Sequence, residues 1–291
     1  MTRFLAPRFW WAALAVCAAA GAAALGGCSE AEAPALDPND PRAGWPDEFV
    51  IGFFGGEDAE AVLNENNLFQ DYLAERLDVP VRAFTGSNYT MVIEAMRAER
   101  VDAMEVGAFS YCLAVEQADA QAIAVNVEAA GDNPTYDPAS TPVYFSTIIT
   151  RKGSGIRTLE DLRGESFTFV DPASTSGHLM PRTLLLKNGI DPDQDMRVRF
   201  AGSHPTSVLA VERGTAAAGA TYDINLRRMH DEGAAPVCYF EDGRVGVERT
   251  QAEIDALYEG CPEGHITIVA MSDPIPNTPF AVRANLPASF K

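Results

Sequence analysis

Short runs of β-branched and aromatic residues alternate along this chain with longer segments whose apolar residues recur every three to four positions. In the first half, the run Phe49–Phe54 begins a series of predicted strands that continues with Val79–Phe84, Val101–Val106 and Ala122–Val127. The intervening segments predict helices, and Tyr89–Arg100 is amphipathic. Strands that alternate with helices at this spacing predict a parallel, doubly wound α/β sheet.

The second half repeats this alternation after a segment with three prolines, Gly131–Pro142, where we expect the chain to cross between lobes. Predicted strands follow at Val143–Thr150, Phe167–Val170, Arg197–Phe200, Ala216–Thr221, Pro236–Phe240 and Ile266–Ala270. Phe280–Arg283 predicts a return strand into the first lobe. The segments 92–107 and 208–223 resemble each other loosely, which is typical of two lobes built from one supersecondary unit.

The segment 167–188 contains the candidate binding chemistry. A strand that ends at Asp171-Pro172 is followed by Ser174, Thr175, Ser176 and Gly177, where a helical apolar pattern begins. The first N–H groups of a helix lack partners and its dipole favours negative charge, so this turn predicts a site for a compact oxyanion. The same residues also fit an ordinary helix cap. They lack the leading glycine of a hydrolase nucleophile elbow and the Gly-Lys-Ser/Thr ending of a nucleotide-binding loop.

Charge limits the classes of partner. The chain has 22 basic and 41 acidic residues, a formal net charge of −19. Such a field repels nucleic acid and anionic membrane surfaces, so we expect neither as a partner. An anionic ligand must therefore be held by local dipoles and hydrogen bonds.

The amino terminus predicts export. Residues 1–27 have a basic start, an apolar stretch and a cleavage region, and Leu25-Gly26-Gly27-Cys28 resembles the lipobox of bacterial lipoproteins. That resemblance implies cleavage before Cys28 and its lipidation; a plain signal peptide and an uncleaved anchor helix are the alternatives. Residues 28–48 are acidic and rich in proline, which predicts a disordered tether. We therefore expect a periplasmic or extracytoplasmic protein that is attached to the membrane by its lipid alone.

Three cysteines remain in the expected mature body. Cys238 and Cys261 flank one polar, glycine-containing excursion, and an oxidising compartment allows a disulfide between them. Cys112 lies among Tyr111, Leu113 and Val115, which predicts a buried small residue.

Several motifs together resemble the periplasmic phosphonate, phosphite and phosphate-binding proteins of ABC importers. The strongest is D-P-A-S-T-S-G at 171–177 with G-I-D at 189–191, and the others follow in the same order along the chain. They are N-Y-T…I-E-A-M at 88–96, V-D-A…G-A-F-S-Y at 101–111, Y-F-S-T-I-I at 144–149, L-E-D-L-R-G at 159–164, G-S-H at 202–204 and S-D-P-I-P-N-T-P at 272–279. The likeness covers about 49 to 291.

The resemblance implies an α/β fold with two doubly wound lobes joined by hinge strands, like type II periplasmic binding proteins. Lobe 1 would comprise 49–140 with 275–291, and lobe 2 would comprise 141–274. Ligand contacts would come from the motif residues Tyr89, Tyr144, Ser174, Thr175, Ser176, His204 and Asp223. The hydroxyls and the imidazole would donate to the ligand's oxygens, whereas Asp223 would accept from a protonated P–OH or an amine. Taken singly, Tyr144 fits a buried aromatic, His204 a loop histidine and Asp223 a helix cap.

Two features depart from the resembled pattern. The turn Gly55-Gly56-Glu57-Asp58 is acidic where neutral donors are expected, so ligand contacts there are in doubt. The sequence also stops at Lys291, where that family continues into C-terminal helices, so we expect either a differently covered lobe or a truncated sequence.

The sequence therefore predicts a membrane-tethered solute-binding protein that captures a phosphonate or phosphite, ahead of phosphate, by hinge closure. Its partners would be an ABC permease and its ATPase, without a cofactor, a metal or catalysis. Two alternatives stay open: a ligand-sensing module for a membrane receptor, and a phosphoester hydrolase on the same scaffold. Against the hydrolase, His178, His204, His230 and His265 are isolated and lack metal-binding spacing.

Overall fold

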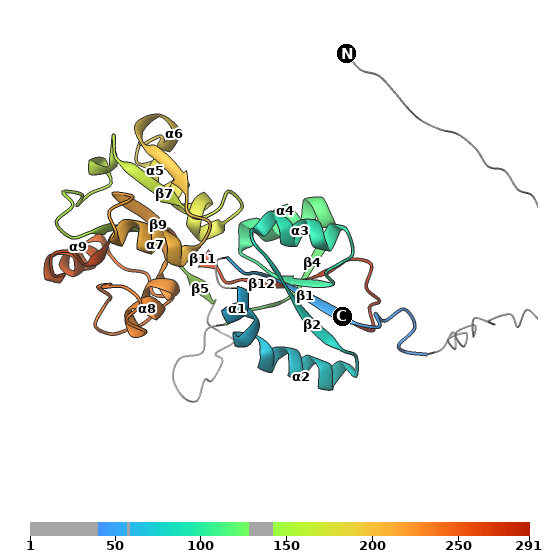
Figure 1. Ribbon diagram of the computed structural model, residues 1–291. Coiled ribbons are helices and arrows are strands. Elements are labelled where there is room, and N and C mark those ends of the chain that lie inside the picture. Colours follow the sequence, from blue (N-terminus) through green and yellow to red (C-terminus); the bar gives the residue numbers. More distant parts are fainter. Residues whose placement is uncertain (1–39, 57–58, 128–141) are drawn as a thin grey trace, which may run out of the picture. The chain divides into compact units, whose positions relative to one another are not determined.

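Two mixed sheets organise the fold of the computed structural model, which describes residues 40–56, 59–127 and 142–291 (Figure 1). Within these ranges the first sheet has five strands in the order β2-β1-β3-β12-β4. Its strands are β1 (Phe49–Phe54), β2 (Val81–Gly86), β3 (Ala103–Glu105), β4 (Ala120–Val125) and β12 (Pro279–Arg283).

Helices pack on both faces of this first sheet because successive residues of its strands point to opposite faces and both sets are apolar. In β1, Val50 packs into a cluster with residues of α3, whereas Phe49, Ile51 and Phe53 pack on the opposite face. The helices associated with this sheet are α1 (Ala59–Glu65), α2 (Asn67–Leu77), α3 (Tyr89–Arg97) and α4 (Ala108–Ala118).

The second sheet also has five strands within the described residues, in the order β10-β6-β9-β7-β8. Separate apolar clusters cover its two faces, one around Phe167 and Phe169 and the other around Ile149 and Ile268. Its strands are β6 (Ser146–Arg151), β7 (Ser166–Phe169), β8 (Arg197–Phe200), β9 (Ala218–Tyr222) and β10 (Ile266–Met271). Its helical elements are a 3₁₀ turn (Glu160–Leu162), a π-helical turn (Thr175–Leu179), α5 (Met180–Lys187), α6 (Pro192–Asp195), α7 (His204–Glu212), α8 (Asp223–Asp231) and α9 (Gln251–Gly260).

The predicted α/β fold with two lobes is confirmed, but each sheet contains one strand that is antiparallel to its neighbours. In the described part of the chain, β12 runs antiparallel to both β3 and β4, and β6 runs antiparallel to both β9 and β10. The other pairs within the two sheets are parallel. The two antiparallel strands are those next to the crossings between sheets, so each enters its sheet in the opposite direction.

A short two-stranded ribbon accompanies these crossings. β5 (Val143–Tyr144) pairs antiparallel with β11 (Ile275–Pro276), and Figure 1 shows the ribbon between the two sheets. The ribbon corresponds to the expected hinge strands. The predicted crossing segment lies outside the described residues from 131 to 141, so the lobe boundaries stay a prediction.

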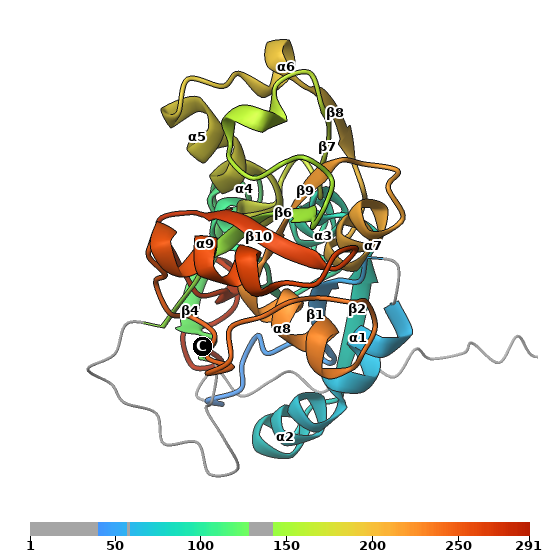
Figure 2. The same cartoon turned by 90° about the vertical axis from the view of Figure 1, so that its left-hand side faces the viewer.

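The two sheets share one topology. The order β8-β7-β9-β6-β10 corresponds strand by strand to β2-β1-β3-β12-β4. The two loosely similar sequence segments fall at equivalent positions, since one contains most of α3 and β3 and the other contains most of α7 and β9. Figure 2 shows the second sheet and its helices from the side, with α8 next to α1.

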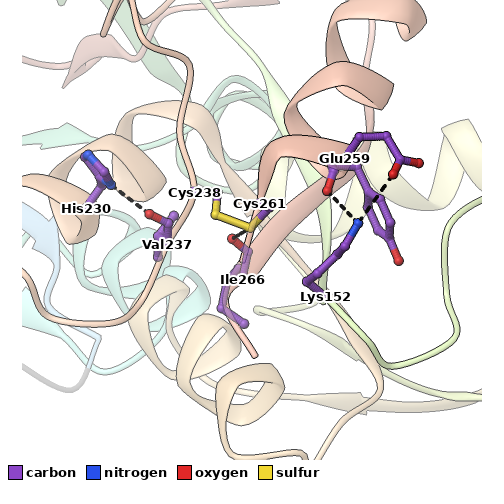
Figure 3. Close-up of a disulfide and its surroundings, with 8 residues drawn as sticks. Lys152, His230, Val237, Cys238, Glu259, Cys261 and Ile266 are labelled. Carbon is purple, nitrogen blue, oxygen red and sulfur yellow. Dashed lines mark hydrogen bonds and ion pairs between the residues drawn. A yellow bond between two sulfur atoms is a disulfide. The ribbon is translucent and has the colours of Figure 1, made fainter. Parts of the chain in front are cut away.

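The predicted strand Pro236–Phe240 is wrong. Among the described residues of this segment, Val237 makes one isolated bridge to Ile266, and the chain then turns away. A disulfide joins Cys238 to Cys261 beside this bridge, as the sequence allows (Figure 3). The excursion between the two cysteines contains α9, an additional helix that begins with a capping box at Thr250 and Glu253.

Two further expectations need correction. Cys112 is exposed, because α4 turns Ser110 and Ala114 inward and places Cys112 on its outer side. The end of the predicted tether belongs to the folded body, since Trp45 packs edge-on against Phe290 at 5.0 Å. Its indole N–H also donates to the Ser289 hydroxyl at 3.0 Å.

The predicted signal peptide, the predicted lipidation site Cys28 and the predicted tether up to residue 39 lie outside the described residues, as do Glu57 and Asp58. In the part of the chain that is described, none of the helices combines the length and the apolar character that a membrane crossing requires.

Candidate functional site

A cavity of about 770 Å³ is lined by residues from both sheets. Most of its lining follows the carboxyl ends of parallel strands, where loops and helix starts converge in α/β folds. Of the seven residues predicted to bind ligand, four line this cavity: Tyr89, Tyr144, Ser176 and His204.

The turn at Ser174–Ser176 is wound more loosely than the predicted helix start. Ser174 caps it by accepting a hydrogen bond from the Gly177 amide at 3.0 Å. The Leu179 amide donates to the Ser174 carbonyl, an i to i+5 bond of the π-helical type. Gly177 is required because a Cβ atom there would lie 2.4 Å from Cβ of Val170. Single π-helical turns are common at functional sites, and this one presents Ser176 to the cavity.

Two buried tyrosines face this turn. Tyr89 is the first residue of α3, placed by the Asn88 cap, and the Ser174 side chain lies close enough to its hydroxyl to influence its pKa. The side chains of Ser176 and Thr175 lie close enough to the Tyr144 hydroxyl to influence its pKa. Burial raises the pKa of Tyr144 to about 12, and burial also raises the pKa of Tyr89 strongly. Both hydroxyls are therefore protonated and available as donors at neutral pH.

In the second half of the chain, His204 has a position equivalent to that of Tyr89. It is the first residue of α7, whose cap Ser203 accepts a hydrogen bond from the Thr206 amide at 3.2 Å. The imidazole is buried and packs edge-on against Tyr222, with ring centroids 4.6 Å apart. Burial, followed by the charge of Arg228, lowers the pKa of His204 to about 3, so this imidazole is neutral at physiological pH.

Thr175 joins the turn to the first half of the chain. Its hydroxyl accepts a hydrogen bond from the Phe109 amide at 2.8 Å, and the Ser110 hydroxyl donates to the Ala173 carbonyl at 2.7 Å. Gly107 allows this approach because a Cβ atom there would lie 2.6 Å from the Thr175 hydroxyl oxygen. Thr175 therefore holds the turn against the start of α4.

Asp223 is not among the residues that line the cavity, as is also true of Ser174 and Thr175, so its expected contact with the ligand stays a prediction. One carboxylate oxygen accepts from the Phe145 amide at 3.0 Å and the other from the Gly246 amide at 2.8 Å. Burial raises the pKa of Asp223, partly offset by these backbone hydrogen bonds. Its visible role is to tie the backbone beside the hinge ribbon to the start of α8.

The sequence of this chain matches a model of a known protein family. The model described as "ABC transporter, phosphonate, periplasmic substrate-binding protein" matches residues 51–291, which include nearly all of both sheets. This chain belongs to that family. Its members are substrate-binding proteins of ABC transporters.

Individual relatives agree with this assignment. The phosphate-import protein PhnD of Mycolicibacterium smegmatis is 27% identical over 230 residues, covering 76% of this chain and 68% of that protein. The phosphonates-binding periplasmic protein of Escherichia coli is 36% identical over 148 residues, covering 49% of this chain and 41% of that protein. A solved binding-protein component of an ABC phosphonate transporter from Pseudomonas aeruginosa has a TM-score of 0.65 at 23% identity, covering 83% of this chain and 70% of that one. This last likeness shows the fold alone.

The family resemblance in the sequence did not identify every charged or aromatic residue at the cavity. Tyr222 lines it, and its position directly before Asp223 in the T-Y-D motif was the available signal. Glu65 and Arg228 also line it and form an ion pair at 3.7 Å between α1 and α8. No local motif marks this pair, because its partners are far apart in sequence. Within the described residues, no group of three or more His, Cys, Asp or Glu side chains is arranged to hold a metal ion.

Proposed function

We propose that this chain is the extracytoplasmic binding component of an ABC importer and that it captures a phosphorus oxyanion in the cavity. Ser174, Thr175 and Ser176 would donate to the ligand's oxygens together with Tyr89, Tyr144 and His204. The ligand would be a phosphonate or phosphite, ahead of phosphate. A permease and its ATPase would then receive the ligand from a lipid-anchored receptor.

The observation that carries this proposal is the convergence of neutral donors on one buried turn. Two protonated tyrosines approach the Ser-Thr-Ser segment, one from the start of α3 and one from the hinge ribbon. A neutral histidine at the start of α7 lines the same cavity. Each hydroxyl can turn its O–H toward a bound oxygen by rotation about one bond. Hydrogen bonds to an ionised acceptor are about twice as strong as neutral ones, so an anion is the matching ligand.

Closure supports the same proposal. The cavity lies between elements of the two sheets, and Thr175 and Ser110 already link the turn to α4. Binding between two bodies joined by hinge strands favours the closed state, because only that state completes the set of donors. Water removed on closure strengthens each hydrogen bond to the anion. The permease would distinguish the closed form from the open form.

A thermal-shift panel tests the ligand class. The mature protein is incubated with phosphate, phosphite, methylphosphonate, 2-aminoethylphosphonate, sulfate or molybdate. A ligand at a concentration 100 times its Kd adds about 2.7 kcal/mol to the free energy of unfolding, which produces a clear increase in Tm. We expect shifts with phosphite or a phosphonate and none with molybdate. A protein stabilised by none of the phosphorus compounds would contradict the proposal.

Variants of the turn locate the site. Ser176→Ala removes a cavity-lining hydroxyl and should weaken binding by about 1.5–3 kcal/mol, the range for a hydrogen bond to a charged group. Thr175→Val and Ser174→Ala should weaken binding by a similar amount, although Ser174→Ala also removes a cap worth ~1 kcal/mol of stability. Ser87→Ala is the control, since Ser87 is exposed and its hydroxyl contacts Met91. Unchanged affinity in Ser176→Ala and Thr175→Val would place the site elsewhere.

A further inference from the structure

The cavity is larger than a small oxyanion requires. Its volume of about 770 Å³ falls in the range of ~300–1,000 Å³ in which proteins hold drug-sized organic ligands. The hydroxyl-bearing residues Ser176, Tyr144 and Tyr89 account for one part of its lining. The rest of the ligand space must therefore match another chemistry.

Part of that remaining space is lined by apolar side chains of three helices, beside polar and charged residues. We call it the apolar arm and define it by Ala61 and Val62 of α1, Leu209 of α7, and Ile224 and Met229 of α8. Figure 2 shows α8 next to α1. The ion pair between Glu65 and Arg228 joins these two helices across the arm.

Most charged side chains that line the cavity already interact with other side chains of the protein. Glu65 pairs with Arg228, whose guanidinium also donates to the Asn225 side chain at 3.3 Å. Glu105 accepts from the Asn126 side chain at 2.8 Å. The third lining carboxylate within the described residues, Glu232, is exposed to water at the end of α8, where attraction to a cation is weak. The arm therefore offers a better environment to an uncharged group than to an ammonium group.

We propose that the apolar arm is a second subsite that takes an uncharged alkyl or aryl substituent carried by the phosphorus atom of the ligand. This inference rests on the proposed function, because the oxyanion must occupy the Ser-Thr-Ser turn for its substituent to reach the arm. The substrate class is then an organophosphonate with an apolar substituent larger than methyl. Burial of each added methylene tightens Kd about fourfold, the equivalent of ~0.8 kcal/mol.

Isothermal titration with a ligand series tests the subsite. The series comprises phosphite and methyl-, propyl-, butyl-, phenyl- and 3-aminopropylphosphonate. We expect butylphosphonate to bind at least tenfold more tightly than methylphosphonate, and at least tenfold more tightly than 3-aminopropylphosphonate of similar length. Equal affinities for methyl- and butylphosphonate, or a preference for the amine, would overturn the inference and leave the oxyanion site intact. Failure of the whole series, phosphite included, would instead overturn the proposed function.

Two variants make the test specific to the arm. Ala61→Phe fills the arm from the surface of α1, and Val62→Thr places a hydroxyl in it with little change of shape. In Ala61→Phe the ratio of the methyl- to butylphosphonate Kd should fall from above ten to about one, and in Val62→Thr it should fall by about half or more. The matched control Ala252→Phe, at an exposed position of α9, should keep the wild-type ratio. If the ratio of the methyl- to butylphosphonate Kd keeps its wild-type value in folded Ala61→Phe and Val62→Thr proteins, the apolar arm is not a ligand subsite.

Discussion

Replacing Gly107 with alanine tests how the turn at Thr175 is held against α4. Gly107 has φ −59° and ψ 159°, which alanine adopts without strain, so the substitution adds one methyl group and little else. That methyl would lie 2.6 Å from the Thr175 hydroxyl oxygen and 3.3 Å from its Cβ. The turn must therefore move away from the start of α4, and the hydrogen bond from the Phe109 amide to Thr175 is lost.

The magnitude follows from these two effects. Net loss of a hydrogen bond costs about 0.5–1.5 kcal/mol, and forcing a methyl group into a packed contact costs about 1–3 kcal/mol. Because both costs apply to the closed arrangement, they should appear mainly in ligand affinity. We expect Gly107→Ala to raise Kd by about thirtyfold, equivalent to ~2 kcal/mol. The unfolding free energy should change much less, since the open protein can relieve the clash.

The assay is isothermal titration with the phosphonate or phosphite that gives the largest thermal shift. Gly260→Ala is the matched control, because a Cβ atom at Gly260 meets no atom within 4 Å. In the double variant Gly107→Ala/Thr175→Ala the clash with the hydroxyl is gone, so the two effects should be less than additive. Wild-type affinity in a folded Gly107→Ala protein, or strict additivity in the double variant, would refute this account of closure.

Three further outcomes concern stability. His204 is neutral in the folded protein because its pKa is about 3. In the unfolded chain the same imidazole gains a proton below about pH 6.5. The free energy of unfolding therefore falls as the pH decreases below that value. Urea titrations should show the wild type losing about 2 kcal/mol more than His204→Gln between pH 7 and pH 5. Arg283→Met removes the partner of the buried Asp102, 2.7 Å away, and should cost about 3 kcal/mol in chemical denaturation; a loss below 1 kcal/mol would contradict a buried pair. Replacing Cys238 and Cys261 with alanine should cost about 3 kcal/mol, and a reducing agent should then have no further effect on the midpoint.

Local pattern determined most of the elements of this protein. Alternation of apolar residues in β1 and the helical period of α3 are properties of a few adjacent residues, so both appear close to their predicted bounds. The same is true of the Ser174 cap, since a hydroxyl next to free amides needs no distant partner. Where the local pattern was weaker, as at Pro236–Phe240, a single bridge replaced the predicted strand.

The tertiary structure decided which of these elements meet. The antiparallel directions of β6 and β12 follow from the two crossings between the sheets. The direction in which strands far apart in sequence pair cannot be predicted from the local periodicity of apolar residues. Tyr89 and His204 converge on one cavity because each begins a helix after equivalent strands of two similar sheets. Asp223 binds backbone amides that are distant in sequence, so its role became visible only when the chain had folded. Sequence therefore determined the donors and the turn, whereas chain path determined their common cavity, because contacts between distant residues depend on topology and not on local propensity.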